Sequence, residues 1–145
     1  MVEYDVILSD LTLNWGKETI LRCLTSPRLA FDFIQEHKIG RCKEIEAAIV
    51  KDPTWALQYA RFVIKGRWPE AEPHIAKNAR CACCYADEII KHRWIEAEKH
   101  IGGKGGVAYS YVKRFEDEIM QDLANPDHKL TNIDRIAIKM IAKYG

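Results

Sequence analysis

Three of the five cysteines of this 145-residue chain lie within four positions, as Cys81, Cys83 and Cys84, and His92 follows shortly after. Thiolate and imidazole groups are the usual ligands of structural zinc, so these residues are candidates for a zinc site. Structural sites generally use two pairs of ligands, each pair separated by about two to four residues, and no second pair is found here. Cys81 also aligns with Trp55, a predicted core position, and a buried reduced cysteine behaves as a small hydrophobic residue. We therefore expect neither a metal nor a cofactor, with zinc at these four residues as the alternative.

An Arg-Trp-x-Glu-x-Glu element occurs twice, beginning at Arg67-Trp68 and at Arg93-Trp94, and recurs in part at Arg41. Arginine and tryptophan often anchor protein interfaces, which makes these residues candidate contacts for a partner. The alternative is structural: the tryptophans fill the turns between helices, and each arginine pairs with a nearby carboxylate. Copies of a repeat share the same packing requirements, which favours the structural alternative.

The remaining motifs offer little chemistry. The glycine-rich run at residues 102–106 could cradle an anion at the start of a helix, but it lacks the phosphate-loop pattern and no strand precedes it. A flexible joint is the favoured interpretation, because glycine clusters mark loops. The glutamates of the repeated element are two positions apart and point to different sides of a helix. No nucleophile, acid–base pair or cofactor motif is recognisable, so we expect a protein that is not an enzyme.

These candidates lie on an internal repeat of 26 residues, which is typical of stacked supersecondary units. Tyr59 recurs at the same interval as Tyr85 and Tyr111, and Trp68 recurs as Trp94. A small residue occupies one further aligned position in four copies: Ala30, Ala56, Ala82 and Ala108. The pattern predicts an all-α fold in which two-helix repeats stack as a short array.

Helix boundaries follow from local signals. Ser26, Asp52 and Asn78 occupy one aligned position and are predicted N-caps, while Gly40 and Gly66 are predicted left-handed C-caps. In the central copy the first helix is expected over 53–65 and the second over 67–77. Residues 4–8 are predicted as a short strand or an extended lead-in.

The C-terminal part departs from the repeat. Thr131 and Asp134 form a capping-box-like pair that predicts a final helix covering the end of the array. We expect one domain over 1–145, with a diverged cap at 1–25, repeats at 26–115 and a C-terminal cap at 116–145.

Composition sets further limits. The net charge of +1 gives no global electrostatic attraction to nucleic acid or to an anionic membrane. The first residues lack the basic region and apolar run of a signal peptide, and no stretch has the apolar length of a membrane span. With five cysteines and no export signal, we expect reduced thiols, a cytoplasmic location and no membrane partner.

The run over residues 51–72, KDPTWALQYARFVIKGRWPEAE, resembles the degenerate short repeats that stand in tandem in proteins of large bacteriophages and some other viruses. The resemblance covers residues 26–115. It implies a phage origin and a small protein acting in the cytoplasm of the infected bacterium, and it carries over no catalytic or binding residue. The chain departs from the repeat at Cys42, where other copies have tryptophan, in the cysteine cluster and in the glycine run.

The repeat architecture favours a non-enzymatic protein that binds a host or viral protein, inhibiting a host defence or a metabolic target. The candidate contact residues are Arg61, Arg67, Trp68, Arg80, Asp87, Lys91, His92, Arg93, Trp94 and Lys104. One alternative is nucleic-acid binding, for which the candidates are Arg67, Lys91, Arg93, Lys104, Lys113 and Arg114. Another alternative is a structural or assembly component of the virion.

Overall fold

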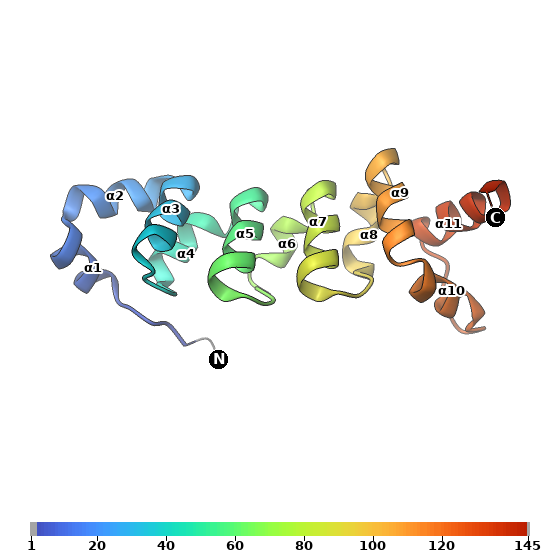
Figure 1. Cartoon of the computed structure of the whole chain (residues 1–145), viewed down its shortest axis with the longest axis horizontal. Coiled ribbons are helices and arrows are strands. Elements are labelled where there is room, and N and C mark those ends of the chain that lie inside the picture. The colour runs from blue at the N-terminus through green and yellow to red at the C-terminus, as the bar shows by residue number, and fades with distance from the viewer. Residues whose placement is uncertain (1–2, 145) are drawn as a thin grey trace. The chain divides into compact units, whose positions relative to one another are not determined.

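The computed structural model describes residues 3–144 and the side chains of residues 3–143, and this part of the chain contains helices and no strand (Figure 1). The predicted all-α class is confirmed. The chain divides into two compact units, Met1–Ile75 and Ala76–Gly145. One continuous array over residues 1–145 stays a prediction.

In the first unit, residues 4–7 form an extended lead-in, which was one of the two alternatives for residues 4–8, whereas Leu8 already belongs to the first helix. The backbone N–H groups of Asp5 and Val6 donate to the carbonyl of Arg41 at 2.9 and 3.2 Å, which ties the segment to the unit. Its helices in chain order are α1 (Leu8–Trp15), α2 (Lys17–Thr25), α3 (Pro27–His37), α4 (Lys43–Ile49), α5 (Pro53–Tyr59), the π-helical η1 (Ala60–Ile64) and α6 (Glu72–Ile75).

The second unit contains the remaining helices, and within it α9 contacts α7, α8, α10 and α11. These elements are α7 (Ala79–Tyr85), the π-helical η2 (Ala86–Ile90), α8 (Ile95–Ile101), α9 (Gly105–Arg114), α10 (Glu116–Ala124) and α11 (Asn132–Tyr144). In neither unit does a described helix have the length and apolar character needed to cross a membrane.

The predicted helix starts are confirmed. The side-chain oxygens of Ser26, Asp52 and Asn78 each accept a hydrogen bond from the backbone N–H three residues later, at 3.3, 3.1 and 3.0 Å. Each bond satisfies one of the N–H groups that a helix start leaves without an internal partner. Three different residue types therefore do the same task at 26-residue spacing.

The helix ends differ from the prediction. The left-handed C-cap residues are Lys38, Lys65 and Lys91, with φ of 52°, 59° and 64°, whereas Gly66 does not have a positive φ. A non-glycine residue in this conformation costs about 1–2 kcal/mol. At Lys65 and Lys91 the backbone N–H is nevertheless satisfied, by the carbonyls of Ala60 and Ala86. Gly40 does have a positive φ of 87°, but it lies in the loop beyond the cap, where a Cβ atom would come within 2.5 Å of Asp5 Oδ2.

The first helix of the central copy continues through the predicted span as α5 and η1, but its last turn is π-helical. The Lys65 N–H donates to the carbonyl of Ala60, five residues earlier, and Lys91 does the same to Ala86 at 2.6 Å. The second helix is shorter than the predicted span of 67–77, since α6 covers only Glu72–Ile75.

Aromatic pairs fill the interior of both units. The ring centroids of Tyr59 and Trp68 are 4.9 Å apart in the first unit, and those of Tyr85 and Trp94 are 5.0 Å apart in the second. All four side chains are buried, with exposed fractions of 5% or less. Such pairs add about 0.5–1.5 kcal/mol beyond the burial of their area.

The predicted capping box of the last helix is confirmed. The N–H of Thr131 donates to Asp134 Oδ2 at 2.8 Å, and the N–H of Asp134 donates to Thr131 Oγ1 at 3.2 Å. Two N–H groups at the start of α11 are thereby satisfied reciprocally. Asp134 is completely buried, which places the capping box inside the polar centre of the second unit.

Candidate functional site

The arginine of each repeated element forms an ion pair with the glutamate five residues later, as the structural alternative predicted. The closest nitrogen–oxygen distance is 2.7 Å in all three copies, but burial increases from one pair to another. The arginine side chain is 53% exposed in the pair Arg67–Glu72, 20% exposed in Arg41–Glu46 and 3% exposed in Arg93–Glu98.

A tyrosine hydroxyl binds the glutamate in the Arg41 and Arg93 copies. Tyr59 donates to Glu46 Oε2 at 2.8 Å, and Tyr111 donates to Glu98 Oε2 at 2.7 Å. The Tyr111 hydroxyl also accepts the backbone N–H of Trp94 at 2.7 Å. Burial and the adjacent glutamate charge raise the pKa of both tyrosines well above the ordinary value, so both hydroxyls stay protonated.

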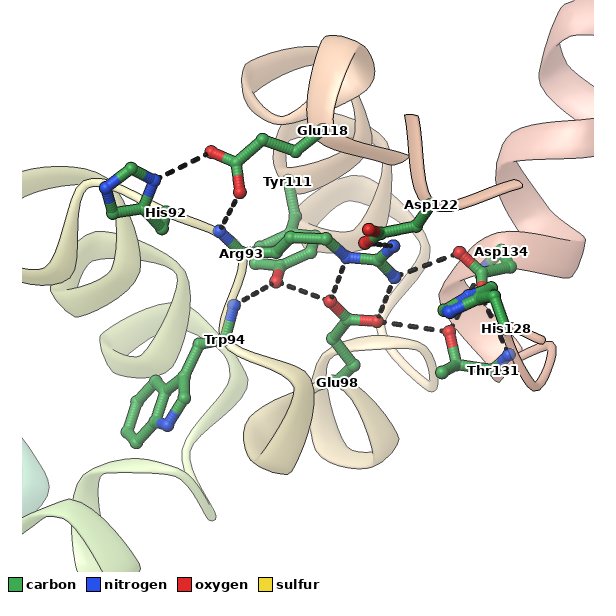
Figure 2. Close-up of polar contacts among 10 residues, drawn as sticks. All are labelled: His92, Arg93, Trp94, Glu98, Tyr111, Glu118, Asp122, His128, Thr131 and Asp134. Carbon is green, nitrogen blue, oxygen red and sulfur yellow. Dashed lines mark hydrogen bonds and ion pairs between the residues drawn. The ribbon is translucent and has the colours of Figure 1, made fainter. Parts of the chain in front are cut away.

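Arg93 is the centre of a buried polar cluster in the second unit (Figure 2). Its guanidinium donates to both oxygens of Glu98 at 2.9 and 2.7 Å, to Asp134 at 2.9 Å and to Asp122 at 2.8 Å. These carboxylates come from α8, α11 and α10, so one cation connects three helices. Thr131 adds a hydroxyl that donates to Glu98 Oε1 at 3.1 Å.

The charges of this cluster are fixed by their surroundings. Burial alone would lower the pKa of Arg93, but the hydrogen bonds and charges of Glu98 and Asp134 outweigh burial and raise it. Burial alone would raise the pKa of Asp134, but the Thr131 N–H, His128 and Arg93 outweigh it and lower the pKa. Arg93 therefore stays a cation and Asp134 an anion, which suits a structural connection between helices.

The rim of the cluster reaches the surface at His92. Its Nδ1 lies 3.3 Å from Glu118 Oε1, and the other oxygen of Glu118 accepts the backbone N–H of Arg93 at 3.0 Å (Figure 2). The His92 side chain is 74% exposed. Glu118 thus links the exposed His92 side chain to the backbone of Arg93.

The structure separates the candidate contact residues into buried and exposed ones. Trp68, Trp94 and Arg93 are buried, with exposed fractions of 2%, 5% and 8%, and their side chains therefore stabilise the interior. Arg67 is exposed and bonded to Glu72. The other exposed candidates are Arg80, Asp87, Lys91, His92 and Lys104, of which Asp87 is paired with Arg114.

Arg61 lies in an aromatic neighbourhood of the first unit. Its guanidinium carbon is 5.7 Å from the ring centroid of Phe62, whose side chain is 46% exposed, and its Nη1 donates to Gln58 at 3.1 Å. Phe62 lies 6.4 Å from Phe31 between ring centroids. Sequence reasoning did not identify Phe62, although its aromatic side chain next to a predicted contact residue was a usable signal.

The candidates for nucleic-acid binding are also separated. Arg93 is enclosed by carboxylates and cannot reach a phosphate, and Arg114 is paired with Asp87. Lys91, Lys104 and Lys113 are exposed. The buried and paired arginines weaken this alternative, because nucleic-acid affinity depends on cations that can replace the counterions of phosphate.

The structure does not bring the cysteine cluster together as a metal site. Cys81 is buried while Cys83 and Cys84 are half-buried, and no group of three or more suitable ligand side chains occurs in the described part of the chain. Burial, with Cys84 and Asp87 nearby, raises the pKa of Cys83 to about 11, so its thiol is protonated and poorly nucleophilic at neutral pH. The side chain of His92 instead faces Glu118.

The glycine run leads into α9 through Lys104, which occupies the N-cap position and makes no side-chain capping bond. Beside it lies a hollow of about 620 Å³, whose lining includes Arg80, Cys83, Lys104 and Val107. The hollow thus combines exposed cations with half-buried apolar groups. Sequence analysis identified Arg80 and Lys104 separately but not their convergence.

Comparison of the chain with protein-family models, with curated proteins and with solved structures found no match. The resemblance to phage repeats therefore stays a prediction.

Proposed function

We propose that this chain is a non-enzymatic phage protein that binds a host or viral protein in the bacterial cytoplasm and inhibits a host defence or metabolic target. The observation that carries the proposal is the contrast between aligned positions. One position of the 26-residue repeat holds the buried tryptophans Trp68 and Trp94. Another position holds Arg61 in one copy and the exposed residues Asp87 and Lys113 in the next two copies. A constant interior with a variable exposed charge pattern suits a scaffold that displays a specific contact surface.

The state of the chemically suggestive residues supports a binding role over a catalytic one. Glu98 and Asp134 hold Arg93 in its charged form, Thr131, His128 and Arg93 hold Asp134 in its charged form, and the tyrosine hydroxyls stay protonated. The Cys83 thiol has a pKa of about 11, the opposite of an activated nucleophile. The groups that resemble catalytic side chains thus serve packing and helix connection.

The test is a pull-down from bacterial lysate with the tagged full chain, with and without nuclease, read by mass spectrometry. We expect one host protein that survives nuclease treatment and then binds the purified chain directly. A charge-reversed variant, Asp87→Lys with Lys91→Glu, should weaken the complex while leaving the circular dichroism spectrum unchanged. Loss of every partner after nuclease, or no specific partner at physiological salt, would overturn the proposal.

A further inference from the structure

Three neighbouring hollows lie in the second unit, along α7, α9 and α11. Two of them, of about 320 and 620 Å³, share Arg80, Lys104 and Val107 as lining residues. The third, also of about 320 Å³, shares Gly105 with the second. We call the three hollows together the depression; α9, which contacts both α7 and α11, lies between the second hollow and the third.

The charged side chains that the structure places along this depression are all basic. Among the described residues, no aspartate or glutamate lines any of the three hollows. The basic lining residues are all exposed, and we call them the basic strip: Lys77, Arg80, Lys104, Lys139 and Lys143. The acidic residues at 116–118 lie elsewhere, in the first turn of α10. Asp87 lies near Cys83, but its carboxylate is paired with Arg114.

Apolar groups lie between the cations. Val107 and Cys83 are half-buried in the hollow between α7 and α9. Ile136, Met140 and Tyr109 line the hollow between α9 and α11, and the Tyr109 side chain is 47% exposed. A partner that matches the depression must therefore carry negative charge and apolar side chains together.

We propose that the basic strip binds an acidic segment of a partner protein, in which aspartate or glutamate alternates with apolar residues. This inference rests on the proposed function and specifies the chemistry of the partner. The carboxylates meet the exposed lysine and arginine side chains, while the apolar residues enter the two hollows beside Val107 and Met140. Charge complementarity sets the rate and specificity of association, and the apolar contacts add affinity.

A nucleic acid fits the same surface less well. Proteins that bind single strands without sequence preference combine cations with several aromatic side chains on which bases stack. Tyr109 is the one aromatic residue among the described lining residues, and the Lys113 ammonium already lies 5.9 Å from its ring centroid. The apolar lining is otherwise aliphatic or sulfur-containing, which suits leucine-like side chains.

The experiment measures the fluorescence anisotropy of a labelled synthetic peptide of mixed glutamate, leucine and phenylalanine. A peptide with glutamine in place of glutamate and an oligothymidine strand of equal length serve as comparison probes. The test variant is Lys104→Glu with Lys139→Glu. The matched control is Lys99→Glu with Lys129→Glu, which changes the net charge equally at exposed positions outside the strip. Circular dichroism verifies that each variant is folded.

We expect the acidic peptide to bind the wild type and the control variant, with an affinity that decreases with salt, and to bind the strip variant about tenfold more weakly. Equal binding to the strip and control variants, no binding of the peptide, or tighter binding of oligothymidine would each overturn the inference. If the wild type, the strip variant and the control variant captured a partner from lysate equally well, the basic strip would not be its binding site, while the proposed function would stand. Peptide binding that depends on the strip, with no protein partner in the lysate, would instead overturn the proposed function.

Discussion

Replacing Arg93 by methionine tests whether burial, rather than pairing itself, determines the energy of the repeated ion pairs. The substitution leaves the buried carboxylates of Glu98 and Asp134, 1% and 0% exposed, without their cation. Removing one partner of a buried ion pair costs about 3–5 kcal/mol, because the remaining charge is desolvated and uncompensated. Asp122 contributes less to this cost, since its side chain is 42% exposed.

The matched control is Arg67→Met, which removes the same side chain from the same element. The Arg67–Glu72 pair has the same 2.7 Å distance, but its side chains are 53% and 14% exposed, against 3% and 1% for Arg93 and Glu98. Because water reaches the Arg67 side chain, this pair is less desolvated, and we expect Arg67→Met to cost clearly less than Arg93→Met. Adding Glu98→Gln to Arg93→Met should recover part of the lost stability, because one stranded charge is removed.

The assay is equilibrium unfolding in urea at neutral pH, followed by circular dichroism. Amide hydrogen exchange read by mass spectrometry reports the two units separately, and we expect faster exchange in α8, α10 and α11 of the Arg93→Met variant. If Arg93→Met and Arg67→Met were destabilised equally, the reasoning from burial would be refuted. A stable Arg93→Met protein with unchanged exchange in these helices would have the same consequence.

Three further predictions concern the same unit. Tyr111→Phe should lower the free energy of unfolding in urea by about 1–3 kcal/mol, because the N–H of Trp94 and the buried Glu98 carboxylate lose their hydroxyl partner. Tyr59→Phe in the first unit should lower it by less. Equal losses in the two variants would contradict this prediction. The folded pKa of Asp134 lies below its ordinary value of 3.8, so its contribution to stability is complete above that value and is lost as the pH falls through the folded pKa. The urea midpoint should therefore fall on acidification below about pH 4, less steeply in Asp134→Asn, and an identical pH profile of the two proteins would argue against it. Alkylation of Cys83 by iodoacetamide, followed by mass spectrometry, should be slow at pH 7. Its rate should increase about tenfold per pH unit up to the thiol pKa of about 11. A rate that reaches a plateau near pH 8 would contradict the raised pKa of Cys83.

Local chemistry explains the features that sequence reasoning predicted correctly. Helix starts at Ser26, Asp52 and Asn78 depend on a side-chain oxygen and an N–H group only three residues away, so neighbouring residues suffice to specify them. The same holds for the capping box of Thr131 and Asp134. The pairing of arginine with a nearby carboxylate was also predictable, because the two lie five residues apart.

The sequence by itself thus determined the all-α class, the helix starts and the pairing of each arginine with a nearby carboxylate. Only the tertiary structure decided which pair is buried: Arg93 meets Asp122 and Asp134 from 29 and 41 residues away, and no local pattern specifies such contacts. It also placed the left-handed cap at Lys65 instead of Gly66 and brought Lys104 and Lys139 to neighbouring hollows along α9. The physical reason is common to all three, since burial and charge depend on which helices pack together, and packing is a property of the whole unit.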